Sequence, residues 1–382
     1  MKTEKLYYKS AYIKEFTAKV VSCEKKGDVY EIVLDKTAFF PEEGGQYADS
    51  GYIDGIRVLD VKERAGVIYH TAEMSIETDK EVACSLDFEE RLEKMRIHSA
   101  EHILSGILHT LYGIENTGFH LGKEDVTFDT SRPISREMLK NIERLANLAV
   151  MRNMPITAEF PSAEELKNMT YRSKLDLTED VRIVTIGDVD ACACCAPHVA
   201  YTGEIGVIKL IDAVTHRGGS RIRMLAGERA LDYISCLSDE ASRVSVMLSA
   251  PVLGISSETE TLLGAKDELK YKLSEANKKI ARLLAESLAD NISVVLTPFS
   301  DKESLRFFVN EVTARREGDL VALFGEEGRY TYLIHSEREN FKEFIKAANA
   351  ALSGKGGGKA PAAEGMFSAT LEEIKAYFAS TQ

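Results

Sequence analysis

The most regular hydrophobic pattern in the chain lies between Asp87 and Gly113. Its apolar residues recur at helical spacing: Leu92, Met95, Ala100, Ile103, Leu104, Ile107 and Leu111. Asp87 is suited to begin a helix and Gly113 to end one, so the pattern predicts one long helix between them. On that helix His98 and His102 are one turn apart and share a face, as two ligands of one metal ion must. Two histidines on a half-buried helix face are the plainer interpretation.

Residues 1–86 show the shorter, alternating patterns of β-strands instead. Residues 17–23 and 29–34 form one pair of strand-like runs, joined by a hairpin signal. Residues 56–61 and 67–71 repeat the arrangement. We expect a small barrel or a strongly bent sheet here, with a glycine-rich motif between the two pairs.

Residues 87–240 combine helices with strands. After the long helix, an amphipathic helix is predicted at 135–153 and a short helix at 163–169. Strand patterns follow at 181–186, 203–214 and 221–225. Because these elements do not alternate as βαβ units, the pattern predicts an α+β domain.

Residues 228–290 are mostly helical, and their first helix, 228–247, overlaps the end of the α+β domain, so we assign 241–290 as a helical or coiled-coil segment. Five apolar residues recur seven apart: Ile255, Leu262, Leu269, Ala276 and Leu283. Two others, Leu273 and Ile280, each lie four residues after a member of this series. This is a coiled-coil seam of about four heptads. An intramolecular helical hairpin and a dimer interface both explain it, and the hairpin is slightly favoured.

Residues 291–382 read as a small α/β domain whose last two helices enclose a glycine-rich segment, residues 353–361. With Lys355 and Lys359, this segment is predicted to be a loop that could cradle phosphate. It lacks the Walker A spacing, so it is not a P-loop. A flexible linker is the plainer interpretation.

Composition narrows the class of protein. With 382 residues the chain is expected to form two or three domains, and its 44% hydrophobic content is that of a globular protein. The chain lacks both a secretion signal and an apolar run of the ~18 residues needed to span a membrane, so we expect a cytoplasmic protein. The net charge of -13 argues against a general nucleic-acid coat and still allows a local basic groove.

Three of the six cysteines cluster at Cys192, Cys194 and Cys195, which indicates metal or thiol chemistry in a reducing compartment. Cys194 and His198 are four residues apart, and Pro197 favours a tight turn over a helix. Together with the two helix histidines they form a nitrogen and sulfur ligand set that suits Zn²⁺.

Adjacent glycines mark the segment between the two strand pairs, at residues 40–46. Gly44 and Gly45 could adopt positive φ or let a ligand approach the backbone closely. A plain turn after Pro41 is the simpler interpretation.

These motifs, in this order, resemble those of the alanyl-tRNA editing proteins (AlaX type) and of the editing domain of alanyl-tRNA synthetases. Residues 98–102 match the family's HxxxH motif and residues 194–198 its CxxxH motif. Residues 40–46 are similar to its glycine-rich motif, and 355–365 to the glycine-rich segment of the synthetase C-terminal domain. The synthetase form has Gly-Gly-Thr between the second pair of ligands, where this chain has residues 195–197, Cys-Ala-Pro.

The resemblance implies hydrolysis of tRNA(Ala) mischarged chiefly with serine, with glycine as a second candidate, as a translation-fidelity function. It implies an ATP-independent hydrolase that uses Zn²⁺ and does not charge tRNA, and it suggests a homodimer. We expect His98, His102 and Cys194 to bind the metal firmly, with His198 as a displaceable fourth ligand. Glu101 is a candidate general base, with a salt bridge as the alternative.

Further residues are predicted to contact the substrate. Those around the amino acid are Thr37, Gly44, Gly45 and Gln46, with Thr37 as a candidate partner of the serine hydroxyl. Those against RNA phosphates are Lys167, Arg172, Lys174, Arg217, Arg221, Arg223, Lys355 and Lys359. Each of these cations taken singly also fits a solvated surface charge.

Two other classes of protein remain open. His98, Glu101 and His102 also form the HxxEH pattern of a zinc peptidase, which would leave Cys194 and His198 without a role. A non-catalytic RNA-binding protein stabilised by zinc is the second alternative. The effect of Cys194→Ala on stability and on activity separates this alternative from an editing enzyme.

Overall fold

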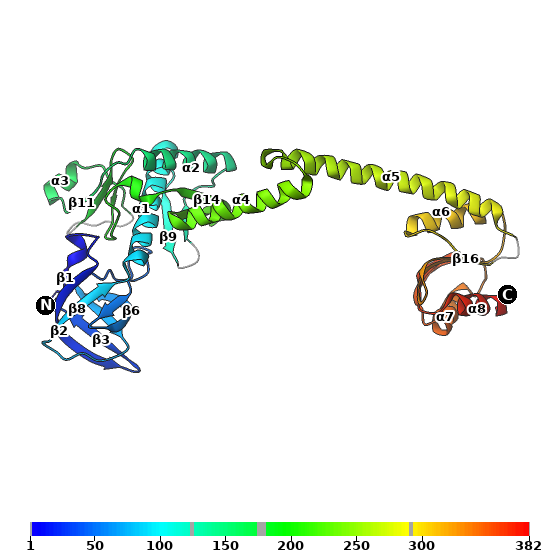
Figure 1. The fold of residues 1–382 in the computed structure, drawn as a ribbon, viewed down its shortest axis with the longest axis horizontal. Helices are drawn as coiled ribbons and strands as arrows, with labels where there is room; N and C mark the ends of the chain where they lie inside the picture. The colour runs from blue at the N-terminus through cyan, green and yellow to red at the C-terminus, as the bar shows by residue number, and fades with distance from the viewer. Residues whose placement is uncertain (1, 123–125, 174–180, 290–292, 382) are drawn as a thin grey trace. The chain divides into compact units, whose positions relative to one another are not determined.

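A computed structural model describes residues 2–122, 126–173, 181–289 and 293–381 (Figure 1). The chain divides into two compact units, Met1–Glu240 and Ala241–Gln382. Sheets and helices are mixed in both, so the expected α+β class is confirmed. Across the described residues, every helix is too short or too polar to cross a membrane.

The N-terminal part of the first unit is a closed barrel with strand order β2-β3-β7-β6-β5-β8 (Figure 1). Its strands are β2 (Glu15–Lys26), β3 (Val29–Leu34), β5 (Gly51–Ile53), β6 (Ile56–Arg64), β7 (Val67–Ala72) and β8 (Glu81–Leu86). Alternate residues such as Val20, Ile32 and Ile68 point inward and are fully buried. Closure pairs the edge strands with each other, which removes free sheet edges.

A short N-terminal segment reaches from the barrel toward the second half of the unit. Strand β1 (Glu4–Lys5) pairs in parallel with β4 (Lys36–Thr37), and the 3-10 turn η1 (Leu6–Tyr8) follows β1. Tyr7 packs edge-on against Phe40, with ring centroids 5.3 Å apart. The glycine-rich segment after Phe40 is therefore anchored to the barrel core.

The predicted long helix is α1 (Phe88–Tyr112), with 25 residues. Gly113 ends it in the left-handed conformation, φ 58°, and donates its N–H to the carbonyl of His109. Asp87 precedes the helix, but its side chain accepts from Ser50 Oγ and pairs with Arg57 instead of capping the first turn. Most of α1 is buried, because it runs through the centre of the unit.

Two antiparallel sheets complete the first unit. The larger has the order β14-β15-β10-β9 and the smaller β11-β12-β13. Their strands are β9 (Asn116–Leu121), β10 (Val126–Thr130), β11 (Ile156–Glu159), β12 (Ile183–Ile186), β13 (Asp190–Ala193), β14 (Ile208–His216) and β15 (Gly219–Ala226). The accompanying helical segments are α2 (Arg136–Met151), α3 (Ala163–Asn168) and the 3-10 turn η2 (Thr202–Ile205). A continuous hydrophobic core joins α1 and α2 to the larger sheet.

Helices α4 (Glu228–Leu248) and α5 (Ile255–Ser287) flank the 3-10 turn η3 (Val252–Gly254). Where α5 packs against α6, it uses Asn277, Ala281 and Ala285, a face offset from the predicted seam. The seam residues Leu262, Leu269, Leu273 and Leu283 are exposed. A helical hairpin would bury these leucines against a second helix. Because they are exposed, the hairpin stays a prediction.

The C-terminal domain is a five-stranded sheet of order β16-β17-β18-β20-β19 with helices α6, α7 and α8. Its strands are β16 (Val294–Leu296), β17 (Leu320–Glu326), β18 (Arg329–His335), β19 (Lys355–Lys359) and β20 (Ala362–Phe367). Its helices are α6 (Lys302–Thr313), α7 (Phe341–Ala351) and α8 (Leu371–Ser380).

The prediction of a glycine-rich loop was wrong, because β19 is a strand paired antiparallel with β20. Glycine is needed there for close packing. A Cβ atom at Gly356 would lie 2.4 Å from the Glu364 carbonyl oxygen and from Tyr332 Oη. The backbone amides of this segment belong to a sheet, so they do not form a phosphate-binding loop.

Candidate metal centre

Two segments about a hundred residues apart supply the predicted ligands. Helix α1 places His98 and His102 on one face, with ring centroids 5.4 Å apart. Cys194 and His198 come from the turn after β13, which is not helical. Arg182 holds this turn, because its Nη1 donates to the carbonyls of Cys194 and Ala196, at 2.9 Å each.

The four side chains converge. One donor atom from each of His98, His102, Cys194 and His198 lies within 4.8 Å of the other three. The sulfur of Cys194 is 3.4 Å from His198 Nε2 and 3.7 Å from His98 Nε2. All three histidines are buried and Cys194 is half-buried.

Each histidine is oriented through its second ring nitrogen. His98 Nδ1 lies 3.0 Å from Gln46 Oε1 and His198 Nδ1 lies 3.0 Å from Ser99 Oγ. His102 Nδ1 lies 3.1 Å from Asp190 Oδ2. A proton on each Nδ1 leaves the Nε2 lone pair for the centre, as is usual for metal-binding histidines. The residues therefore fit a metal ion, and three nitrogens with one sulfur suit Zn²⁺.

The local electrostatics favour the metal-binding protonation states of His198 and Cys194 but not that of His102. Burial alone would lower the pKa of His102, but Cys194 and Asp190 beside it raise that pKa well above its usual value. Burial lowers the pKa of His198 to about 3, so its ring is neutral. Burial alone would raise the pKa of the Cys194 thiol, but His98 and His102 beside it hold that pKa well below its usual value. Burial raises the pKa of Cys192 and Cys195, so these two thiols stay protonated.

A buried ion pair supports His102 from behind. Arg172 donates to both carboxylate oxygens of Asp190, at 2.7 and 2.8 Å. Asp190 in turn accepts from His102. Sequence reasoning missed Asp190. The signal available was its position two residues before Cys192, which puts both side chains on one face of β13.

Glu101 lies in the same cavity as the histidines. Its Oε1 accepts hydrogen bonds from Ser105 Oγ and Asn116 Nδ2. Within the described ranges the carboxylate has hydrogen-bond donors at this oxygen and no ion pair, which disfavours the salt-bridge alternative. Both of these described hydrogen-bond donors are neutral.

The glycine-rich motif contributes one wall. Gly44 and Gly45 both have positive φ, 64° and 82°. Gly44 lines the cavity, and a Cβ atom there would lie 3.9 Å from His98 Cε1. Gly45 packs against Phe119, whose carbonyl oxygen would lie 2.3 Å from an added Cβ.

Two predicted substrate contacts lie elsewhere. Gln46 is fully buried behind His98, where it orients that ring. Thr37 is also fully buried, and its Oγ1 lies 2.9 Å from His70 Nε2 and accepts the N–H of Phe39. Among the described residues that line the cavity, neither appears. The structure therefore does not bring them to the substrate side.

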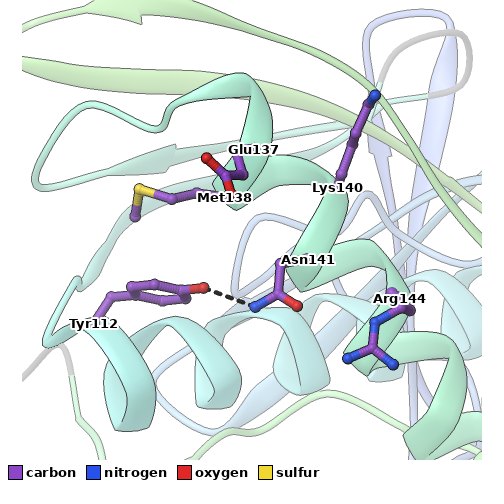
Figure 2. A pocket seen from close by; sticks show the side chains of 6 residues that line it. All are labelled: Tyr112, Glu137, Met138, Lys140, Asn141 and Arg144. Atoms are coloured by element: carbon purple, nitrogen blue, oxygen red, sulfur yellow. Dashed lines mark hydrogen bonds between the residues drawn. The ribbon is translucent and has the colours of Figure 1, made fainter.

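The cavity over the centre has a volume of about 430 Å³, within the range of small-molecule sites. Three candidate ligands line it, with Glu101, Arg172 and Arg182. A second hollow of about 530 Å³ lies between the end of α1 and α2. There Asn141 Nδ2 donates to Tyr112 Oη at 2.9 Å, and none of the predicted ligands is present (Figure 2).

The predicted RNA-binding cations have different surroundings. Arg221 donates twice to Asp129, and Arg223 is held by Asp212. Arg217 lies at the tip of the β14–β15 turn, and Lys167 is exposed on α3. Arg172 is occupied by Asp190, as described above, and the prediction for Lys174 lies outside the described residues. Lys355 and Lys359 are exposed on β19, in the second unit.

Comparison with known proteins finds similarity to tRNA synthetase domains and to alanyl-tRNA editing proteins. Residues 181–225 match the domain described as threonyl and alanyl tRNA synthetase second additional domain, and residues 2–90 match tRNA synthetases class II (A). The alanyl-tRNA editing protein AlaX-L of Pyrococcus horikoshii is 30% identical, covering 97% of this chain and 96% of that protein. Alanine–tRNA ligase of Methanococcus vannielii is also 30% identical, over 98% of this chain. Only 43% of that ligase is covered, so the chain spans less than half of its length.

Proposed function

The chain belongs to the alanyl-tRNA editing proteins of the AlaX type, and from this we propose that it hydrolyses the aminoacyl ester of tRNA(Ala) mischarged with serine or glycine. The observation that carries the proposal is the convergence of three imidazoles and one thiol at an open cavity. The reaction consumes water and releases the free amino acid and the tRNA, so it needs no ATP.

We propose that His98, His102, Cys194 and His198 hold a zinc ion. The ion would supply a Lewis acid for the ester carbonyl or for a water molecule. Gln46, Asp190 and Ser99 fix the three rings so that each Nε2 points inward. This orientation is established before substrate binds, which lowers the cost of forming the reactive arrangement. His198 Nε2 lies closer to the Cys194 sulfur than His98 Nε2 does, so these distances do not mark His198 as the displaceable ligand. We propose that role because a catalytic zinc site keeps one position open.

Glu101 is the proposed general base. Ser105 and Asn116 both donate to its Oε1, and its second oxygen would accept the proton of the attacking water. The same carboxyl group can then return that proton to the ribose oxygen of the leaving tRNA. Gly44 presents backbone without a side chain beside His98, which leaves room for the aminoacyl group.

We propose Arg217, Lys355 and Lys359 as the predicted phosphate contacts with the best access, because in the described part of the chain no carboxylate pairs with them as Asp129 and Asp212 pair with Arg221 and Arg223. The exposed leucines of α5 support a homodimer, because three of them, Leu262, Leu269 and Leu273, lie on one helical seam. Analytical ultracentrifugation of the wild type and of Leu269→Lys tests the dimer. A wild-type monomer would contradict it.

The proposed reaction is tested by incubating the protein with Ser-tRNA(Ala), Gly-tRNA(Ala) and Ala-tRNA(Ala). We expect rapid loss of the serine ester, retention of the alanine ester, and no hydrolysis by Cys194→Ala. Cys236→Ala is the matched control, because Cys236 is exposed on α4 in the same chain. Equal rates on serine and alanine esters, or full activity of Cys194→Ala, would contradict the proposal.

A further inference from the structure

Phe160 and Tyr8 form an aromatic wall of the cavity over the metal centre. Phe160 follows β11 and is 52% exposed, although its ring is wholly apolar. It packs edge-on against Tyr8, with ring centroids 5.3 Å apart, and both residues line the cavity. Single exposed apolar residues are common on protein surfaces, but this one belongs to the wall of a site.

This wall is connected to the candidate metal centre by direct contacts. The guanidinium of Arg182 lies over the Tyr8 ring, 5.2 Å from its centroid. The same guanidinium holds the carbonyl of Cys194. Tyr8 and Phe160 are therefore held at a defined position relative to the ligands, and they come from parts of the chain about 150 residues apart.

We propose that the exposed ring of Phe160, held edge-on by Tyr8, binds the terminal nucleobase of the tRNA by stacking, while the aminoacyl ester lies beside the histidines. The inference rests on the proposed function, in which the ester is carried by the terminal ribose. That ribose joins the ester to the base directly, so a site that holds one must accommodate the other within the same cavity. Aromatic side chains stack on bases of every type, because each base has a π-face.

The chemistry of the wall favours the base over the amino acid as its occupant. The seryl group is small and ends in a hydroxyl, for which the apolar Phe160 ring offers no hydrogen-bond partner. Polar groups elsewhere in the cavity, among them Glu43, Glu101 and Arg182, suit that hydroxyl better. A planar purine is large enough to cover the exposed face of the Phe160 ring by stacking on it.

The test compares wild type with Phe160→Ala, Phe160→Tyr and Tyr271→Ala. Phe160→Tyr keeps an aromatic face, and Tyr271 is a matched exposed aromatic, 68% exposed on α5. For each variant we would measure kcat and KM with Ser-tRNA(Ala), bound zinc, and the Kd of a fluorescent CCA trinucleotide.

Phe160→Ala is expected to raise KM and the trinucleotide Kd by about 5- to 150-fold, the range that base–aromatic stacking supports. Bound zinc and kcat should stay near wild type, and the two other variants should behave like wild type. Unchanged trinucleotide affinity in Phe160→Ala would overturn the proposal. So would a change confined to the preference for serine over alanine, which would assign the wall to the amino acid.

The trinucleotide titration also separates this inference from the proposed function. A wild type that hydrolyses no ester, yet binds the trinucleotide more tightly than Phe160→Ala does, would contradict editing and retain the stacking site. A wild type that hydrolyses the serine ester while Phe160→Ala matches it in both KM and Kd would retain editing and overturn the stacking site.

Discussion

Replacing Asp190 by asparagine tests whether the ion pair behind His102 positions that ring. The change keeps the shape of the side chain but removes the charge that faces Arg172. Asp190 and Arg172 have side chains 2% and 12% exposed. Removing one partner of such a buried pair leaves an uncompensated charge, so we expect a loss of about 3 kcal/mol in the free energy of unfolding. The weaker hold on His102 should lower zinc affinity by about 10- to 100-fold, the usual effect of losing an outer partner.

Urea unfolding and competition for zinc with a colorimetric chelator measure the two effects separately. Asp129→Asn is the matched control, because Asp129 also pairs with an arginine, Arg221, but at the surface. It should leave zinc affinity unchanged and cost much less stability. The double variant Asp190→Asn with Arg172→Met should recover part of the lost stability. Wild-type zinc affinity in Asp190→Asn would refute the positioning role of this carboxylate.

Two further predictions concern stability. Burial lowers the pKa of His70 from 6.5 to about 4, so between these pH values the unfolded chain binds more protons than the folded chain, and stability falls as the pH drops. At ~1.36 kcal/mol per pKa unit, the loss in the free energy of unfolding reaches about 3 kcal/mol near pH 4. Urea unfolding at pH 7 and 4.5 should show a smaller loss for His70→Gln than for wild type. An equal loss in the two proteins would contradict the assignment to His70. Gly356→Ala should destabilise the C-terminal domain by about 1–3 kcal/mol through its clash with Glu364, whereas Gly357→Ala meets nothing within 4 Å and should unfold at nearly the wild-type temperature. Equal thermal shifts in the two glycine variants would count against the close packing of β19.

The elements that sequence reasoning predicted well are those defined by local chemistry. The long helix was predicted between Asp87 and Gly113, and the structure bounds it at Phe88 and Tyr112, with Gly113 ending it as expected and Asp87 paired elsewhere. His98 and His102 then share a face by helical geometry alone. Their meeting with Cys194 and His198 depends on the fold. The two motifs together predicted one ligand set, and the structure brings the four side chains together.

The elements that it predicted poorly depend on partners distant in sequence. Strand β19 is nearly all glycine, so it has no alternating pattern, and only its pairing with β20 makes it a strand. The packed face of α5 is set by α6, a partner that heptad spacing does not specify.

The sequence also did not predict the direction in which side chains near the motifs point. Gln46 lies beside the glycine-rich motif as expected, but its side chain turns inward to His98. Thr37 turns to His70 in the barrel. Proximity in sequence to a motif therefore did not determine which of these groups faces the cavity. Asp190 shows the converse, because its role depends on His102 and Arg172, neither of which is near it in sequence.

The most direct test of the account is the rate of Ser-tRNA(Ala) hydrolysis before and after the protein is stripped of metal and then reloaded with Zn²⁺. We predict that the rate falls to background in the stripped protein and returns on addition of one equivalent of zinc. Hydrolysis at the full rate by protein shown to be free of metal would contradict the claim that the three histidines and Cys194 form a catalytic metal centre.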